Sequence, residues 1–449
     1  MTGISGSVDE FRSAAEANEL HTIELAIPDT QGHLRGKRIP VKRFFDSVHE
    51  AGANVADAMF VFDMQNDLPD NEFVNMDTGY LDCHLVPDNA TGRILTHRPG
   101  YGIVFADADN EHGDPHPLSP RGVLAAQIAR CQAAGVDPVV ATELEFFLCT
   151  PEWDPVQDHI QYSSLTDGLE WEPVLADMRA ALLGAGIEVE GSNAEYGAGQ
   201  FEINTSYADA MTTADNTALF KSIVKQVARQ HGLRATFMPK PWAEQSGSGM
   251  HVHTSLLADG VNAFAACNDG EPNDLMRAWM GGLLEHAEAM TLLGAPTSNG
   301  PKRIRPYTFA PTHVTWGLDN RTVLARCIAE ADSKANRVEY RSAGADANPY
   351  LIIAGILAAG VDGIERQLDP GMLCEGDMYG NPGDHKALPT DLAGAIAAYA
   401  DSPLAAQLGD TFSRSYVSIA EAEVPLAAEN NPDADDVNDW ERARFLEHS

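Results

Sequence analysis

The chain has 449 residues, 44% of them hydrophobic, and a formal net charge of −36. This length predicts two or three domains, and the strong negative charge argues against nucleic acid and anionic membranes as partners. The chain has no run near the ~20 apolar residues of a membrane span, no secretion signal and no CxxC cysteine pair, which together predict a cytoplasmic protein.

Short strand-like runs alternate with turns from residue 21 to about 110. They are HTIELAI (21–27), RIPV (38–41) and GIVFADAD (102–109). DTQGHLRGKRIP predicts a hairpin whose turn lies at Gln31–Gly32, and residues 41–52 predict a helix that ends at Gly52. This part of the chain is therefore expected to form a small sheet-containing domain.

A proline-rich joint, PHPLSPRGVLAAQIARCQAAG (115–135), leads into a helix. We expect the domain boundary here, with domains over residues 1–112 and 113–449. Beyond the joint, periodicity predicts helices at 173–186, 216–232 and 350–368, and strands at 141–148, 199–206, 249–256 and 336–342. Mixed strands and helices indicate an α+β protein. The acidic segment from Glu421 onward predicts solvated surface.

The strand ATELEFFL (141–148) carries two glutamates on one face. Alternation along a strand puts Glu143 and Glu145 on one side and Leu144, Phe146 and Leu148 on the other. Neighbouring carboxylates on a largely buried strand repel each other and lose hydration unless cations or donors lie opposite. The strand alone leaves two interpretations open: an acidic strand end in water, or a metal or catalytic site.

Three further segments also bring charged groups together. They are GSGMHVH with His251 and His253, NRVEYR with Glu339 and Arg341, and EYGAGQFE with Glu195 and Glu202. A lone histidine pair is more often structural than metal-binding. Carboxylates and an imidazole gathered from four strands can, however, hold two divalent ions of the Mg²⁺ or Mn²⁺ type.

Arginines cluster close to these strands in the sequence. They are Arg303 and Arg305 in PKRIRP, Arg321 and Arg326 in DNRTVLAR, and Arg337. One interpretation is that these arginines only form salt bridges at the surface, since the chain is so acidic. The guanidinium fork also binds phosphate and carboxylate groups bidentately, so that metals and arginines together indicate phosphoryl transfer from a nucleotide.

ELEFF, EYGAGQFE, KPWAEQSGSGMHVHTS, NGPKRIRPYTFAP, DNRTVLAR and NRVEYRSAGADANPYL resemble, in order and spacing, the signature segments of the glutamine synthetase family. DTQGHLRGKRIPV resembles the family's N-terminal segment. The resemblance implies an N-terminal β-grasp domain and a catalytic domain with a curved antiparallel sheet lined by metal ligands and packed with helices. It also implies a homo-oligomer, usually a dodecamer of two stacked hexamers, with active sites shared between neighbours.

The resemblance also implies roles for individual residues. Glu145, Glu195 and Glu202 match the ligands of the first metal, and Glu143, His251 and Glu339 match those of the second, for two or three Mg²⁺ or Mn²⁺ ions per site. Arg303 and Arg341 match glutamate-binding positions, together with Ser246 and Gly247. The residues that match nucleotide-side positions, with ATP as co-substrate, are His253, Ser255, Arg321, Arg326, Lys334 and Arg337.

The departures from the family pattern concern the amine. Phe309 stands where the ammonia-using members carry a glutamate that helps to take a proton from ammonium. The ammonium-site loop is also missing, and FDMQND offers Asp63 as a substitute base. We therefore expect Arg303, Arg321, Asp63 and Phe309 to act in catalysis by a ligase that joins glutamate to an organic amine. An ordinary glutamine synthetase and a non-catalytic homologue remain alternatives.

An aromatic ring at position 309 favours an amine that carries an apolar group, because burying that group stabilises the complex by ~1.5–3 kcal/mol. A small monoamine is the first expectation. A polyamine would need an acidic partner for its distal ammonium, and Asp63, Asp67 or Glu72 of a neighbouring subunit could supply one.

Overall fold

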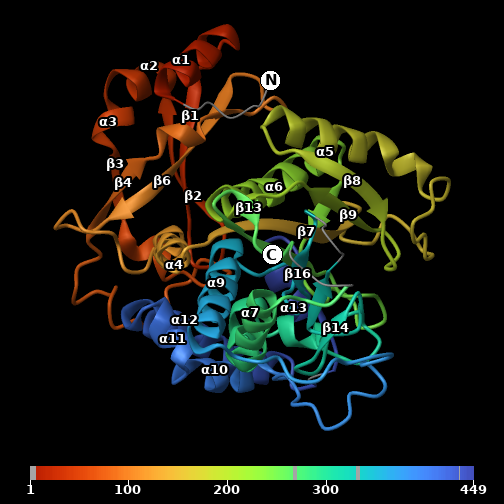
Figure 1. Ribbon diagram of the computed structural model, residues 1–449. Helices are drawn as coiled ribbons and strands as arrows, with labels where there is room; N and C mark the ends of the chain where they lie inside the picture. Colours follow the sequence, from red (N-terminus) through yellow and green to blue (C-terminus); the bar gives the residue numbers. More distant parts are fainter. Residues whose placement is uncertain (1–6, 266–269, 330–333, 434) are drawn as a thin grey trace.

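The computed structural model describes residues 7–265, 270–329, 334–433 and 435–449. Two sheets organise these residues, with the first at the upper left of Figure 1 and the second to its right. Among the described residues, every helix is too short or too polar to cross a bilayer.

The first sheet uses the strands up to residue 109 in the order β2-β1-β6-β4-β3, with β5 on β6. β1 pairs antiparallel with β2 and parallel with β6, so the sheet is mixed. The elements of this part are α1 Val8–Ala17, β1 Thr22–Pro28, β2 Leu34–Pro40, α2 Val41–Arg43, η1 Phe44–Val48, α3 His49–Ala51, β3 Ala53–Ala56, η2 Asp57–Phe60, β4 Asp82–Pro87, η3 Asn89–Thr91, β5 Arg93–Ile94 and β6 Tyr101–Asp109.

The local predictions for this part are confirmed. β1 and β2 form the predicted hairpin, and Gly32 in its turn has φ +85°, a conformation that glycine adopts without strain. The helical segment after β2 ends at Gly52, whose φ is +66°, although residues 44–48 form a π-turn inside it. The predicted boundary at 112/113 lies between β6 and α4 and stays a prediction.

The second sheet has the order β14-β15-β16-β12-β7-β9-β8, with β10 and β11 on β7 and β13 on β12. All of its pairs are antiparallel except β14 with β15. Its strands are β7 Asp137–Cys149, β8 Val189–Ala194, β9 Gln200–Thr205, β10 Ala208–Asp209, β11 Arg234–Thr236, β12 Met250–Ala258, β13 Val261–Asn262, β14 Trp316–Leu318, β15 Ala325–Ile328 and β16 Arg337–Tyr340. The four predicted strands lie in β7, β9, β12 and β16.

Helices surround this sheet. They are α4 Pro120–Ala133, η4 Leu169–Trp171, α5 Glu172–Gly184, α6 Ala210–Gln230, α7 Asp274–Glu285, α8 Ala287–Gly294, η5 Gly300–Arg303, α9 Pro349–Arg366, α10 Leu392–Ala400, α11 Pro403–Leu408, α12 Asp410–Asn430 and α13 Asp439–Phe445. The apolar face of β7 (Leu144, Phe146 and Leu148) is fully buried in the main core, as its alternation predicts. The opposite face of β7 is left for Glu143 and Glu145.

Helix α6 begins six residues before the predicted start. Asp209 caps it by accepting a hydrogen bond from the backbone N–H of Thr212, which satisfies a donor that would otherwise lack a partner. The apolar helix α9 is buried, as predicted, beside α7 (Figure 1). A Cβ atom on Gly282 or Gly363 would lie about 2 Å from a backbone oxygen of the other helix, so glycine permits this close crossing.

The prediction that the acidic C-terminal segment is solvated surface is confirmed for most of its acidic residues, among them Glu421, Glu429 and Asp433, and is wrong for two. Glu423 and Glu441 are 8% and 1% exposed. Arg444 pairs with Glu423 at 2.7 Å, and Lys302 pairs with Glu441 at 3.0 Å. These cations compensate the buried carboxylates, which a count of acidic residues along the sequence cannot reveal.

Candidate active site

A cleft of about 710 Å³ opens over the face of the second sheet that carries the charged residues. Strand register builds this face. Glu145 of β7 lies opposite Glu202 of β9, His251 of β12 lies opposite Glu143 of β7, and His253 lies opposite Glu339 of β16. The sheet therefore brings together all four segments that the sequence analysis had selected.

The predicted first metal group, which we call the carboxylate triad, consists of Glu145, Glu195 and Glu202. One oxygen of each lies within 4.8 Å of the others. The backbone N–H of Gly249 donates to Glu145 at 2.6 Å, and the amide of Asn193 donates to Glu195 at 2.8 Å. Neighbouring groups thus hold the carboxylates in place.

The carboxylate triad carries more negative charge than its protein neighbours compensate. Burial and the nearby Glu195 raise the pKa of Glu145 to about 7, and burial and the nearby Glu145 raise the pKa of Glu202 to about 9. Burial also raises the pKa of Glu195. Without a cation Glu202 holds a proton at neutral pH and Glu145 holds one part of the time, and a divalent cation would relieve the same repulsion.

The predicted second metal group consists of Glu143, His251 and Glu339. His251 Nδ1 lies 3.5 Å from an oxygen of each carboxylate. Ligand atoms around an ion with bonds of 2.0–2.1 Å lie roughly 3 Å apart, and the two distances at His251 are close to this spacing. The groups whose ligand atoms all lie within 4.8 Å of one another, however, join Glu143 and His251 to Glu202, or join Glu143 and Glu339 to His253.

The charge state of the second metal group suits ligation as well. Burial and the nearby Arg341 lower the pKa of His251 to about 4, which keeps the imidazole neutral. Burial would raise the pKa of Glu339, but Arg341 and His251 outweigh it and hold that pKa at about 2. Burial is likewise outweighed at Glu143, whose pKa is lowered by hydrogen bonding to His251 and His253. The donor atoms of both groups therefore fit hard divalent ions.

The predicted nucleotide-side residues lie on β12, β15 and β16 or in the loops before β15 and β16, and of these residues only Arg321 lines the cleft. Arg326 donates to Glu339 at 2.8 Å. The Ser255 hydroxyl bonds to Asn262 at 2.9 Å, and the amide of Asn262 donates to the carbonyl oxygen of the exposed Lys334. His253 and Arg337 bond to each other at 3.1 Å.

The predicted glutamate-side residues Ser246, Gly247, Arg303 and Arg341 all line the cleft. Arg303 is 2% exposed and donates to a backbone oxygen at 3.0 Å. Arg341 donates through Nη1 to Glu339, whereas its buried Nε has no hydrogen-bond partner among the described atoms. A Cβ atom on Gly247 would lie 2.7 Å from Arg303, so only glycine leaves this approach open. An oxyanion could satisfy the remaining donor of Arg341.

Aromatic rings lie together at one side of the cleft. Phe309 lies edge-on to Tyr196 with ring centroids 4.9 Å apart, and Tyr196 is 6.5 Å from Tyr162. All three line the cleft, and Phe309 is 46% exposed. We call Tyr162, Tyr196 and Phe309 the aromatic edge.

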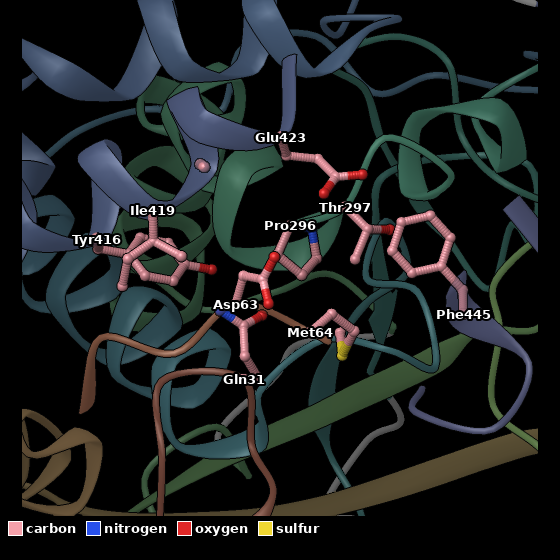
Figure 2. Close-up of a pocket in the computed structure, with 10 residues that line it drawn as sticks. Gln31, Asp63, Met64, Pro296, Thr297, Tyr416, Ile419, Glu423 and Phe445 are labelled. Carbon is pink, nitrogen blue, oxygen red and sulfur yellow. The ribbon is translucent and has the colours of Figure 1, made fainter. Parts of the chain in front are cut away.

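Asp63 does not line the cleft of its own chain. Figure 2 shows it in a separate small cavity with Gln31 and Met64. Its Oδ2 accepts a hydrogen bond from Arg444 at 2.7 Å, and its Oδ1 accepts from backbone N–H groups in its own loop. The expectation that Asp63 belongs to the catalytic site is therefore wrong for the cleft of its own chain, because Arg444 holds its side chain elsewhere.

Sequence reasoning missed several residues of the cleft, among them Gln200, Tyr162, Tyr196 and Tyr379. Gln200 and Tyr196 lie inside EYGAGQFE, where strand alternation and adjacency to Glu195 could have identified them. Gln200 donates to the Gly247 carbonyl at 3.0 Å. Tyr162 and Tyr379 come from irregular segments, and no local pattern indicates that they reach the cleft.

Comparisons with known proteins agree with the predicted resemblance. Residues 117–444 match the model of the glutamine synthetase catalytic domain. A γ-glutamylethanolamide synthetase of Streptomyces coelicolor is 36% identical over 98% of this chain and 96% of its own length. A glutamate–isopropylamine ligase of a Pseudomonas species is 34% identical over 98% and 97% of the two chains. A solved GmaS–ADP complex has a TM-score of 0.83 at 32% identity, covering 96% of this chain and 98% of that one, which confirms the predicted fold.

Proposed function

Because the chain belongs to the glutamine synthetase family, we propose that it is an ATP-dependent ligase that joins the γ-carboxylate of L-glutamate to a small organic amine. We propose an organic amine because the aromatic edge lines the same cleft as residues of the two metal groups. The relatives named for ethanolamide and isopropylamine products support an amine of this class.

In the first step, a γ-carboxylate oxygen of glutamate attacks the terminal phosphorus of ATP. The bond to the ADP oxygen breaks, and γ-glutamyl phosphate forms. Arg341 and Arg303 hold carboxylate groups of glutamate through their guanidinium donors, and Arg321, Arg326 and Arg337 face the phosphates. When bound, Mg²⁺ or Mn²⁺ ions neutralise charge on the transferring phosphoryl group.

In the second step, the neutral amine attacks the acyl carbon, and inorganic phosphate leaves. Alkylammonium ions have a pKa near ~10 by analogy with lysine, so a base must remove a proton first. We assign this role to Asp63 of a neighbouring subunit. The aromatic edge holds the apolar part of the amine and excludes water, which also protects the acyl phosphate from hydrolysis.

This assignment requires sites shared between subunits. Since one chain holds Asp63 away from its own cleft, we propose a ring-shaped homo-oligomer of the family's dodecameric type. Such an assembly would bring the loop at 62–67 of one subunit to the cleft of the next.

The decisive experiment measures phosphate release from ATP with Mg²⁺ and glutamate against separate amines. The panel should contain ammonia, methylamine, isopropylamine, ethanolamine and putrescine, with the amide product identified by mass spectrometry. We expect a small monoamine to exceed ammonia in kcat/KM. Equal or better use of ammonia would identify an ordinary glutamine synthetase, and no turnover with any amine would contradict the ligase.

A further inference from the structure

His253 lies in the middle of a hydrogen-bonded chain that connects two parts of the site. On one side, its Nε2 lies 2.9 Å from Oε1 of Glu143, a member of the second metal group. On the other side, its Nδ1 accepts from Nε of Arg337 at 3.1 Å. His253 is only 6% exposed, so water does not easily replace either partner.

The donor on Arg337 determines which nitrogen of His253 carries the hydrogen. The guanidinium Nε–H can only donate, so Nδ1 must be the acceptor and Nε2 must carry the hydrogen. Nε2–H then donates to Oε1 of Glu143. With that oxygen engaged, the other oxygen of Glu143 is the one directed toward His251, at 3.5 Å.

We infer that His253 is a positioning residue for the second metal group, and that it couples this group to the nucleotide side through Arg337. The inference rests on the proposed function only in placing Arg337 near the phosphates. Hydrogen-bond partners of a metal ligand fix its orientation, and their loss typically weakens metal affinity by about 10–100-fold. His253 therefore acts on Glu143 before any nucleotide is bound.

Two substitutions separate the two hydrogen bonds. His253→Gln retains an N–H near the position of Nε2 and removes the acceptor for Arg337. His253→Asn retains an acceptor near the position of Nδ1 and removes the donor to Glu143. Arg337→Lys keeps the positive charge but loses the Nε–H that orients the imidazole.

The test measures Mn²⁺ binding without nucleotide by electron paramagnetic resonance, in a Glu145→Gln background that disables the carboxylate triad. We expect His253→Asn to weaken the remaining Mn²⁺ site by about 10–100-fold. His253→Gln should bind Mn²⁺ nearly as well as the unaltered background, and Arg337→Lys should show a smaller loss than His253→Asn. ADP binding, followed by calorimetry with Mg²⁺, should fall in His253→Gln and Arg337→Lys.

His286→Asn is the matched control, because His286 is also buried and hydrogen-bonded to a carboxylate, at 2.8 Å from Asp362, but lies outside the cleft lining. Its Mn²⁺ affinity should equal that of the background. Thermal melting checks that each variant is folded. If folded His253→Asn binds Mn²⁺ like His286→Asn, the positioning role is wrong. These binding measurements do not depend on which amine is used, so they stand apart from a failure of the proposed ligase activity.

Discussion

Glu145 of β7 lies directly opposite Glu202 of β9, so that a half-buried and a buried carboxylate are neighbours across one pair of strands. Glu195 completes the carboxylate triad within 4.8 Å. Such an arrangement opposes folding unless a cation or protons neutralise it. The free-energy cost of gathering these carboxylates is the physical reason to expect a metal ion at the triad.

Glu145→Gln should abolish turnover, because a ligand of a catalytic ion is lost. In metal-free protein, the same change should raise the melting temperature at pH 8. The raised pKa of about 7 means that ionised Glu145 destabilises the native state. This cost grows as the pH rises from the pKa of glutamate in the unfolded chain to the native pKa of about 7. Above pH 7 the full cost amounts to about 3 kcal/mol of unfolding free energy. Calorimetry at pH 5 and pH 8 tests the expectation that the stabilisation shrinks at low pH. Glu190→Gln, an exposed change on β8, is the control.

Metal affinity of the carboxylate triad should rise with pH. Glu145 and Glu202, with pKa values of about 7 and about 9, must release protons when a cation binds. Below pH 7 both groups release protons, one to two per ion, and the Mn²⁺ affinity should rise roughly 10–100-fold per pH unit. Between pH 7 and pH 9 mainly Glu202 releases a proton, and the affinity should rise about tenfold per unit. Titrations by electron paramagnetic resonance between pH 6 and pH 9 measure this slope, and a flat profile would contradict the charge balance described for this site.

Arg341→Lys should raise the KM for glutamate by about 10–100-fold, because the fork that binds a carboxylate is lost while the charge remains. The KM for ATP should change little. Arg277→Lys is the control, since Arg277 pairs with Asp369 at the surface. Steady-state kinetics with each substrate varied in turn provide the measurement. A loss confined to ATP would show that Arg341 serves the phosphates instead.

Phe309→Glu should shift preference from alkylamines toward ammonia. The change removes an apolar contact worth about 1.5–3 kcal/mol, or roughly ten- to a hundredfold in affinity, and adds an anion that can accept a proton from ammonium. Phe309→Ala should lower alkylamine use without improving ammonia use. Tyr307→Phe, which lies outside the cleft lining, is the control. If Phe309→Ala has the same amine selectivity as the unaltered protein, the aromatic edge does not recognise the amine.

Active protein should behave as a large ring in light scattering. Asp63→Asn should then reduce the second step in the assembled protein, because the base would come from the next subunit. A stable and fully active monomer would contradict both the assembly and the shared site.

Much of this site could be predicted from sequence because strands have a period of two. Alternation alone separates Glu143 and Glu145 from the apolar face of β7, and the structure confirms that separation. Collinear motifs were sufficient to predict the fold. The caps and turns at Gly32 and Gly52 followed from backbone preferences that act over a few residues.

Tertiary structure decided the contacts between residues far apart in the chain. Strand register brings Glu143 to His251, and irregular segments carry Tyr162 and Tyr379 into the cleft. The burial of Glu423 depends on Arg444, and Asp63 is held by the same arginine. Local sequence specifies which face a side chain occupies, because that depends on neighbouring dihedral angles. It does not specify which distant charge lies opposite, because that choice is made by packing of the whole core.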